Sequence, residues 1–185
     1  MSQYMSLIGQ KARKASFKKI KTKIKNKILK KYALLLDKKK DFILKVNTKD
    51  VKLALNNGLE NNLVDRLTLD LKKLNNITSS INKITTLKDP VDNILEKWST
   101  PNGLKISRVS IPIGVIGVIY ESRPNVTSDV ASLCFKSGNA VILKGGSEAI
   151  NTNKILVRLF RKVLKENKVN ENFIQFIDSK DRKMV

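Results

Sequence analysis

The stretch IPIGVIGVIYESRPNVTSDVASLCFKSGNAVILKGGSEAINTNK, residues 111–154, decides the fold of this chain. Two apolar runs within it, Gly114–Tyr120 and Ala140–Lys144, have the composition of buried strands in a parallel sheet. Between them, Pro124–Ser137 predicts a helix that Gly138 ends. Strand, helix and strand in this order form a βαβ unit. Ligands of open α/β sheets bind at the carboxyl ends of the strands.

The same alternation continues toward the C-terminus. A helix is predicted from Ser147 or Glu148 to about Glu166, a third strand at Phe173–Ile177, and the start of another helix at Ser179–Val185. Strands that alternate with helices are joined by right-handed crossovers. We therefore expect an α/β fold with a parallel sheet that helices cover on both faces.

The first part of the chain is predicted to be helical. Through residues 3–45, apolar residues recur at three- and four-residue intervals with lysines between them. Such a basic amphipathic helix can lie on a membrane or a nucleic acid, but packing on a sheet with a solvated lysine face is the favoured interpretation. Thr48 and Asp50 are expected to cap another helix, which ends near Gly58.

Two shorter helical segments and a hairpin follow. NNLVDRLTLD (61–70) is expected to form a short helix or turn, and its last residue caps a helix over residues 71–87. Asp89-Pro90 ends that helix. Ile94–Trp98 and Leu104–Ile111 have strand composition and are separated by a turn sequence, which predicts a hairpin whose apolar surface needs a partner.

Composition limits the class of protein. A chain of 185 residues suits one domain, and it holds no apolar run long enough to cross a membrane and no secretory signal. Its single cysteine fits a reducing compartment. The net charge of +21 is the balance of 37 basic and 16 acidic residues. Of the basic residues 30 are Lys and only 7 are Arg, in a sequence crowded with Asn and Ile. This balance favours compositional drift over a dedicated nucleic-acid surface, since specific phosphate and base recognition prefers Arg.

The first candidate binding loop is the sequence YESRPN, residues 120–125. It lies between a predicted strand and a predicted helix, where the helix N-terminus favours anions. Arg123 can hold a carboxylate or phosphate in two parallel hydrogen bonds, and Asn125 offers both a donor and an acceptor. The alternative is that Glu121, Ser122 and Asn125 cap the helix while Arg123 pairs with Glu121.

The second candidate loop is KGGSE, residues 144–148. Its order of strand, glycines and helix resembles a phosphate-binding loop, although it matches neither the Rossmann nor the Walker pattern. Lys144 is positioned to bind a ribose hydroxyl or a phosphate of a nucleotide, and Ser147 to contact the same group or cap the helix. The alternative is a Gly-Gly turn that is needed only for steric reasons.

No convincing nucleophile accompanies these loops. Cys134 lies among apolar residues in the middle of a predicted helix, where a small buried hydrophobic residue is the favoured interpretation. The chain has no histidine, which excludes Ser-His and Cys-His pairs and the usual zinc sites. We therefore expect neither a catalytic residue nor a metal site in this chain.

Taken together, residues 111–149 closely resemble the γ-glutamyl phosphate reductase (glutamate-5-semialdehyde dehydrogenase) family of the aldehyde dehydrogenase superfamily. The resemblance is densest in GVIGVIYESRPNVT and FKSGNAVILKGG. It extends to Leu63–Leu67 and Asp89–Val91 upstream and to Ile174–Asp178 downstream. It implies NADPH-dependent reduction of L-glutamyl 5-phosphate to L-glutamate 5-semialdehyde and phosphate, in proline biosynthesis, through a cysteine thioester.

The resemblance also implies site residues and an incomplete enzyme. The cofactor NADP(H) is expected at Ile119, Tyr120, Lys144, Gly145, Gly146 and Ser147, and the substrate at Glu121, Ser122, Arg123 and Asn125. Cys134 does not match the family's catalytic cysteine. The chain is therefore expected to be an N-terminal fragment that is inactive alone, with a Rossmann-like sheet, incomplete, that stops before the catalytic domain.

Three segments are expected within this fragment: an N-terminal helical part at 1–92, an oligomerisation hairpin at 93–111 and a dinucleotide-binding βαβ core at 112–185. The resemblance implies a cytoplasmic homo-oligomer with a small-molecule substrate and with neither a specific nucleic acid nor a membrane as partner. The alternative is a non-catalytic basic module that binds nucleotides or polyanions.

Overall fold

The structure, a computed structural model, describes residues 3–179. Three parallel strands form its sheet in the order β3 (Val115–Ile119), β4 (Ala140–Lys144) and β5 (Ile174–Phe176). The helix α6 (Pro124–Lys136) joins β3 to β4, and α7 (Ile150–Glu166) joins β4 to β5. The predicted βαβ order and parallel pairing are confirmed. The helix predicted over 179–185 lies, apart from its first residue, outside the described residues.

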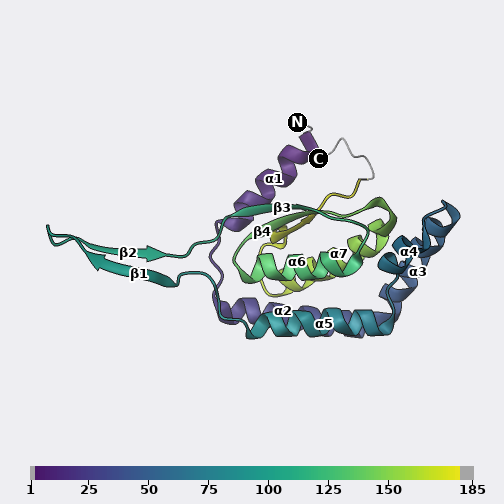
Figure 1. Cartoon of the computed structure of the whole chain (residues 1–185), viewed down its shortest axis with the longest axis horizontal. Coiled ribbons are helices and arrows are strands. Elements are labelled where there is room, and N and C mark those ends of the chain that lie inside the picture. Colours follow the sequence, from purple (N-terminus) through teal and green to yellow (C-terminus); the bar gives the residue numbers. More distant parts are fainter. Residues whose placement is uncertain (1–2, 180–185) are drawn as a thin grey trace.

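Helices cover both faces of the sheet (Figure 1). On one face, α1 (Gln3–Ser16) contacts all three strands. On the other, α6 packs on β4 and α7 on β5, and α2 (Thr22–Lys38) and α5 (Leu71–Thr86) form a further layer against them. This arrangement removes the apolar sides of the central strand from water, as a parallel sheet requires.

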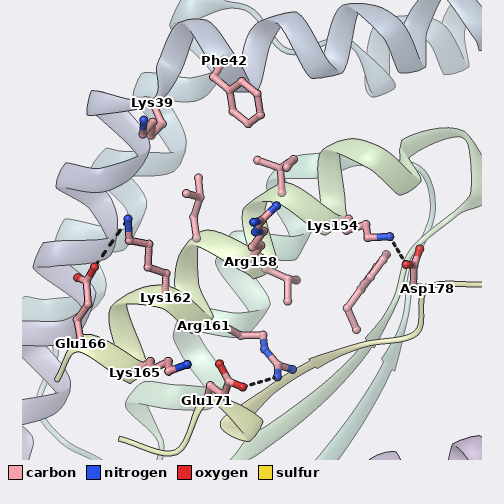
Figure 2. Close-up of a pocket in the computed structure, with 14 residues that line it drawn as sticks. Lys39, Phe42, Lys154, Arg158, Arg161, Lys162, Lys165, Glu166, Glu171 and Asp178 are labelled. Atoms are coloured by element: carbon pink, nitrogen blue, oxygen red, sulfur yellow. Dashed lines mark hydrogen bonds and ion pairs between the residues drawn. The ribbon is translucent and has the colours of Figure 1, made fainter. Parts of the chain in front are cut away.

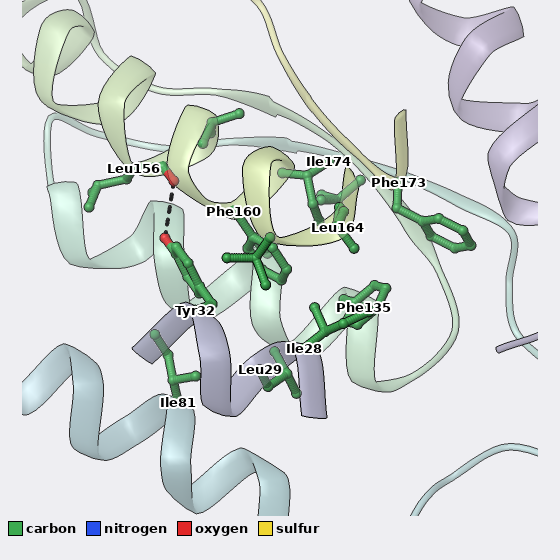
Figure 3. Packing of buried hydrophobic residues seen from close by; sticks show 14 of the residues in the cluster. Ile28, Leu29, Tyr32, Ile81, Phe135, Leu156, Phe160, Leu164, Phe173 and Ile174 are labelled. Atoms are coloured by element: carbon green, nitrogen blue, oxygen red, sulfur yellow. Dashed lines mark hydrogen bonds between the residues drawn. The ribbon is translucent and has the colours of Figure 1, made fainter. Parts of the chain in front are cut away.

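Aromatic rings fill the space between α2, α6 and α7 (Figure 3). Tyr32 stacks on Phe160 with 4.3 Å between ring centroids, and Phe135 meets Phe160 edge-on at 5.7 Å. The buried phenol of Tyr32 is satisfied by Ser128 Oγ at 2.8 Å and by the Leu156 carbonyl, to which it donates at 3.2 Å. Stacked and edge-on rings of this kind add to the stabilisation that burial itself provides.

The prediction of one helix over residues 3–45 is wrong. The chain breaks at residues 17–21 and again at Lys39, which gives α1, α2 and α3 (Lys40–Asn56). The reason is tertiary: α1 lies on the face of the sheet opposite to α2, so the chain has to turn around the sheet between them. Periodicity alone does not show to which face of the sheet a helix packs.

The capping roles predicted for Thr48 and Asp50 are also wrong, because both residues lie inside α3. Thr48 Oγ1 instead donates to the Leu44 carbonyl one turn earlier at 2.9 Å. The expected helix end near Gly58 is confirmed, since α3 ends at Asn56 and Gly58 has a φ of 76°. Asp50 has a different function, which is described with the site.

Asp70 does cap the helix that was predicted after it. Its Oδ1 accepts from the backbone N–H of Lys73 at 2.6 Å, which satisfies one free donor at the start of α5. Before it, α4 (Asn61–Leu67) is the expected short helix. These two elements bring Arg66 and Lys73 to the same end of the sheet as the predicted binding loops.

The predicted hairpin is present and projects away from the rest of the molecule (Figure 1). Strand β1 (Ile94–Ser99) pairs antiparallel with β2 (Lys105–Val109), and every residue of both strands is exposed. The exposed side chains include Ile94, Leu95 and Trp98. A two-stranded ribbon with both faces in water is marginally stable by itself, so this one needs a partner surface.

The prediction of burial holds for β4 but not for β3. Four of the five residues of β4 are buried, whereas β3 is an edge strand of the described sheet with no buried residue. Its last residue, Ile119, is 68% exposed. In addition, none of the helices in residues 3–179 combines the length and the apolar character of a membrane span.

Candidate functional site

The two predicted loops meet at the carboxyl edge of the sheet. The backbone N–H of Tyr120 donates to the Lys144 carbonyl at 3.1 Å, which extends the pairing of β3 and β4 by one step. Beyond this point the hydroxyl of Ser122 donates to the Glu148 carboxylate. The loops are therefore one structural unit, although they are separated by the whole of α6.

Close approach explains the glycines of the second loop. A Cβ on Gly146 would lie 2.0 Å from Ser122 Oγ and 2.9 Å from the Ser122 backbone nitrogen. A Cβ on Gly145 would lie 2.4 Å from Asn153 Nδ2. Both glycines have a steric reason, as the alternative interpretation required. The absence of a Cβ at these two positions therefore lets Ser122 and Asn153 pack directly against the backbone of the second loop.

A network of hydrogen-bonded side chains lies next to Gly145. Tyr120 Oη and Thr127 Oγ1 are 2.7 Å apart, and Thr127 Oγ1 donates to Asn153 Oδ1 at 2.8 Å. Burial raises the pKa of Tyr120 to about 12, although the Thr127 hydrogen bond lowers it in part. The phenol is therefore neutral at physiological pH. Tyr120 acts in this structure as a wall of the loop.

The start of α7 is held in place by α3. Asp50 is 1% exposed, and its Oδ2 accepts from the backbone N–H of Thr152 at 2.8 Å and from Thr152 Oγ1 at 2.6 Å. Its Oδ1 accepts from Asn151 Nδ2 at 2.7 Å. One turn earlier in α3, Asn47 accepts from the Leu69 backbone N–H at 2.7 Å. A single face of α3 thus fixes both the second loop and the segment after Arg66.

The predicted cofactor residues are differently exposed. Ile119 points to solvent, whereas Lys144 is only 7% exposed, and its Nζ lies 3.5 Å from the Gly145 carbonyl. Ser147 Oγ donates to Glu148 Oε1 at 2.6 Å and lines a cavity of about 380 Å³ with Asp50 and the residues around Gly58. The six predicted residues are therefore gathered at one edge of the sheet, but they do not share one cavity.

The predicted substrate residues lie around two small cavities. The first, called the loop cavity below, measures about 330 Å³ and lies between the two loops and the α3–α4 connection. It is lined by Leu59, Leu63, Arg66, Glu121, Ser122, Arg123, Gly146 and Glu148.

The second cavity, called the α5–α6 cavity below, also measures about 330 Å³. It is lined by Asp65, Arg66, Leu69, Lys73, Asn76, Ile77, Ser80, Arg123, Asn125 and Asp129. Arg66 and Arg123 border both cavities, so their guanidinium groups form the boundary between them.

Glu121 draws the two arginines together. Arg66 Nη1 and Arg123 Nε both lie 3.3 Å from Glu121 Oε2. The pairing of Arg123 with Glu121 that the alternative interpretation expected is thus present, but a second arginine shares the same carboxylate. The cluster keeps a net positive charge at the carboxyl edge of the sheet, and this charge suits an anionic group of a ligand.

The sequence prediction missed Arg66 and Asp129. Arg66 reaches the loop from α4, and 55 positions separate it from Glu121, so no local pattern connects them. Asp129 had a local signal, because it follows Asn125 by four residues and shares a face of α6 with it. Burial raises the pKa of the Asp129 carboxyl, and a hydrogen bond from Asn125 lowers it in part.

A larger cavity of about 770 Å³ lies elsewhere, on the outer side of α7 (Figure 2). Its walls are basic, but several of the charges are paired within it: Lys154 with Asp178, and Arg161 with Glu171 at 3.1 Å. It contains none of the predicted site residues. Size alone therefore does not identify the site, and the residues at the sheet edge remain the candidates.

Cys134 is buried, as predicted, and its thiol is unreactive by environment. Burial raises its pKa to about 11, so the thiolate is scarce at neutral pH. Within residues 3–179, no three His, Cys, Asp or Glu side chains are grouped as metal ligands would be. The described part of the chain therefore offers binding groups without an activated nucleophile.

The amino-acid sequence of this chain is similar to those of known proteins. No family model matches the chain. Curated sequences do: a γ-glutamyl phosphate reductase of Aquifex aeolicus is 47% identical over 166 residues, which cover 90% of this chain and 38% of that protein. The Persephonella marina protein of the same name is 42% identical over 184 residues, covering 98% of this chain and 41% of that protein. This chain is a homologue of γ-glutamyl phosphate reductase.

Solved structures agree. The γ-glutamyl phosphate reductase of Thermotoga maritima superposes with a TM-score of 0.94 at 41% identity, covering 97% of this chain and 44% of that one. The Saccharomyces cerevisiae enzyme gives 0.91 at 31% identity and covers 100% of this chain and 48% of that one. A propionaldehyde dehydrogenase of Rhodopseudomonas palustris, at 17% identity and a TM-score of 0.65, shares the fold alone.

The homology covers nearly all of this chain but only part of each relative. The chain spans about two-fifths of the length of the curated γ-glutamyl phosphate reductases that it matches. The expected α/β fold with a protruding hairpin is confirmed, and so is the resemblance to that family. The roles of individual residues follow below as proposals.

Proposed function

We propose that this chain forms part of a γ-glutamyl phosphate reductase, which reduces L-glutamyl 5-phosphate with NADPH to L-glutamate 5-semialdehyde and phosphate in proline biosynthesis. The proposal rests on the homology together with one structural observation: the two loops and Arg66 converge at the carboxyl edge of the parallel sheet. That edge is where open α/β sheets bind their ligands. The chain would supply binding residues, since its one cysteine is buried.

The second loop fits a dinucleotide. Gly145 and Gly146 let the two loops pack closely at the strand ends. The Lys144 ammonium has only a long contact of 3.5 Å to compete with an anionic ligand. A lysine at this position can neutralise the 2′-phosphate that distinguishes NADP from NAD. Tyr120 and Ile119 would form the wall beside it, and Ser147 would hydrogen-bond the same ligand. When bound, NADPH supplies the hydride.

The first loop fits the substrate. Glu121, Ser122, Arg123 and Asn125 are arranged around the start of α6, where backbone dipoles favour negative charge. Arg123, with Arg66 beside it, would bind an anionic group of the substrate. The Asn125 amide is exposed and can donate to an oxygen of the acyl group. These residues orient the substrate, and the attacking thiolate would come from outside this chain.

Binding of the cofactor tests the assignment of the second loop. Calorimetric titration of the 185-residue chain with NADPH should show binding that Lys144→Ala weakens about tenfold or more, since a charge-assisted contact of this kind is worth about 1.5–3 kcal/mol. Lys97→Ala, in the exposed hairpin, is the matched control and should change nothing. Equal affinities of the wild type and Lys144→Ala for NADPH would remove this lysine from the site.

Turnover tests the catalytic part of the proposal. The purified 185-residue chain should not oxidise L-glutamate 5-semialdehyde in the presence of NADP and phosphate, because the only thiol is buried. Turnover by this chain alone would refute the account. In a longer, active protein that contains this chain, Arg123→Ala should lower kcat/KM. An unchanged kcat/KM would refute the role of Arg123.

The proposed domain organisation gives the hairpin a function in assembly. Residues 1–92 would be the helical part of the cofactor domain, 93–111 an oligomerisation hairpin and 112–185 the dinucleotide-binding core. The support is the exposed apolar surface of β1 and β2, which a second subunit can cover in a homo-oligomer. A biosynthetic enzyme with one cysteine in 185 residues suits the cytoplasm, and cell fractionation would test this location.

A non-catalytic, polyanion-binding module is the second candidate, and the net charge of +21 favours it. The two candidates differ in the salt dependence of binding. Attraction of exposed lysines to DNA should weaken steeply between low salt and about 200 mM salt, as counterion release requires. Tight DNA binding that persists at that salt concentration, together with no affinity for NADPH, would replace the reductase proposal by this one.

A further inference from the structure

The α5–α6 cavity contains charges of both signs. Asp65 and Asp129 contribute carboxylates, while Arg66, Lys73 and Arg123 contribute cations. A cavity for a simple anion would need only the cations. The charges that pair with each other inside the protein are not available to a ligand, and the remaining ones are.

Lys73 and Asp65 satisfy each other. Lys73 Nζ donates to the Asp65 carbonyl at 2.6 Å and to the Thr68 carbonyl at 3.0 Å, and it lies 3.4 Å from Asp65 Oδ1. These contacts use all three donors of the ammonium group. This pair fixes the connection between α4 and α5, so its role is structural. The charged residues that remain to face a ligand are Arg66, Arg123 and Asp129.

Asp129 and the two arginines have hydrogen-bonding atoms that remain available to a ligand. Asp129 Oδ1 is buried and has no hydrogen-bond partner among residues 3–179. Arg66 and Arg123 each approach Glu121 at 3.3 Å through one nitrogen, and the Arg123 contact lacks hydrogen-bond geometry. A guanidinium group carries five N–H donors, so most of those on both arginines remain available to an anion. A buried acceptor without a donor is costly unless a ligand completes it.

A ligand that satisfies both ends must carry a cation and an anion close together. Arg123 precedes the first residue of α6 and Asp129 follows it by six positions, which corresponds to about 9 Å along the helix axis. Both side chains line the α5–α6 cavity, so this span leaves room between them for a small zwitterion. The ammonium and carboxylate on the α-carbon of an amino acid have this arrangement.

We infer that the α5–α6 cavity binds the α-amino-acid end of the substrate, with Asp129 accepting from the α-ammonium group and with Arg66 and Arg123 binding the α-carboxylate. The inference rests on the proposed function, since a glutamyl phosphate carries this group at the end opposite to its phosphate. It makes Asp129 a specificity residue: it selects an amino-acid acyl phosphate over a plain dicarboxylic one.

Two ligands that differ only at the ammonium group test this assignment. L-Glutamate and N-acetyl-L-glutamate are titrated calorimetrically into the 185-residue chain, its Asp129→Asn variant and its Asp65→Asn variant. The wild type should prefer L-glutamate by about tenfold or more, the factor that one charge-assisted hydrogen bond provides. Asp129→Asn should bind the two ligands alike. Asp65→Asn, the matched control in the same cavity, should keep the preference, because its carboxylate belongs to Lys73.

Stability distinguishes this role from a structural one. A carboxylate that supports the fold lowers the unfolding temperature when it is replaced. Asp129→Asn removes the charge of a carboxyl whose buried Oδ1 has no donor among residues 3–179, while the side-chain amide can still accept from Asn125. Its thermal midpoint should therefore equal or exceed that of the wild type. A wild type without preference between the ligands, or without affinity for either, overturns the inference, and so does a folded Asp129→Asn variant that keeps the preference. The wild-type comparison requires no variant, so it decides even if Asp129→Asn does not fold.

The outcome for the cavity is independent of the outcome for the reductase. A preference for L-glutamate that Asp129→Asn abolishes, in a chain without affinity for NADPH, would refute the reductase and leave an amino-acid site. Affinity for NADPH together with equal binding of the two glutamate ligands would keep the reductase and refute this assignment of Asp129.

Discussion

Gly146 is the residue at which the two loops of the site come closest. A methyl group there would meet both the side chain and the backbone of Ser122, and the backbone cannot rotate away. We expect Gly146→Ala to lower the free energy of unfolding by about 1–3 kcal/mol, the usual cost of overpacking. Urea unfolding measures it. Gly117→Ala is the control, since a Cβ on this strand glycine meets nothing within 4 Å. Equal effects of both substitutions would contradict the contact.

At the same scale, local sequence explains which site residues could be predicted. Arg123 and Asn125 stand in a strand-to-helix turn whose composition is visible in a window of six residues. Arg66 and Asp129 face the same cavity, but their contribution depends on how α4, α5 and α6 pack. Lys144 was predicted correctly at the end of its strand, yet its burial could not be read from the sequence.

Among the elements, α7 depends on α3 for its start. The carboxylate of Asp50 accepts three hydrogen bonds from the first residues of α7, so it caps a helix that begins 100 residues later. Asp50→Ala leaves buried donors unpaired and should destabilise the protein by about 3 kcal/mol. Asp37→Ala, at an exposed position of α2, should change stability by less than about 0.5 kcal/mol. Guanidinium unfolding of both variants compares them, and a similar midpoint for the two would argue against this cap.

The same pair of elements shows where sequence-based prediction failed and why. Asp50 was recognised as a capping residue type, but it was assigned to the start of its own helix. The assignment failed because capping can act through space, and sequence shows only neighbours. By contrast, Asp70 was assigned correctly because its partner, the Lys73 backbone N–H, is three residues away. Elements with local signals were predicted, and those with distant partners were not.

The hairpin contains a tryptophan whose fluorescence can show whether a second subunit covers the strands. Trp98 is the only tryptophan of the chain, and it is 44% exposed in β1. If a second subunit covers β1 and β2, tryptophan emission should shift to shorter wavelength as the protein concentration rises, in parallel with an increase in mass by light scattering. Leu95→Lys and Ile106→Lys should abolish both changes, because a charge on the apolar strands disfavours their burial. A constant mass and constant emission over the whole concentration range would exclude the hairpin as an interface.

In the whole molecule, charge has two distinct roles. Most of the 37 basic residues are exposed and contribute to solubility and to non-specific attraction of polyanions. Lys25 and Lys136 are different, being 2% and 3% exposed. Lys25 Nζ lies 2.6 Å from Asp89 Oδ2, and Lys136 Nζ donates to Asn26 Oδ1 at 2.7 Å. The Lys25–Asp89 pair joins α2 to the segment before the hairpin, and the Lys136–Asn26 contact joins α6 to α2. The first of these contacts helps to set where the hairpin leaves the rest of the molecule.

Asp89 makes this junction sensitive to acid. Its burial alone raises the pKa of the carboxyl, but hydrogen bonds from Lys25, Thr22 and the Val91 backbone outweigh that effect, so the pKa lies below the ordinary 3.8. The unfolded chain therefore binds a proton more readily than the folded one. The stabilisation is complete above pH 3.8 and is lost as the pH falls from there through the folded value. Acid should thus loosen the hairpin junction before it affects the apolar core.

Asp89→Asn tests this dependence against a matched neighbour. The variant leaves Lys25 buried without its anion, so at neutral pH it should be destabilised by about 3–5 kcal/mol. This difference from the wild type should shrink as acid protonates Asp89 in the wild type. Asp92→Asn is the control: Asp92 also lies 2.6 Å from a lysine, Lys19, but that pair is exposed and should contribute at most about 1 kcal/mol. The two lysine–aspartate pairs have the same N–O distance and differ in how far they are buried. Urea unfolding of both variants from pH 7 to pH 3 therefore measures how burial changes the contribution of such a pair to the free energy of unfolding. Equal losses would show that burial of Lys25 adds nothing.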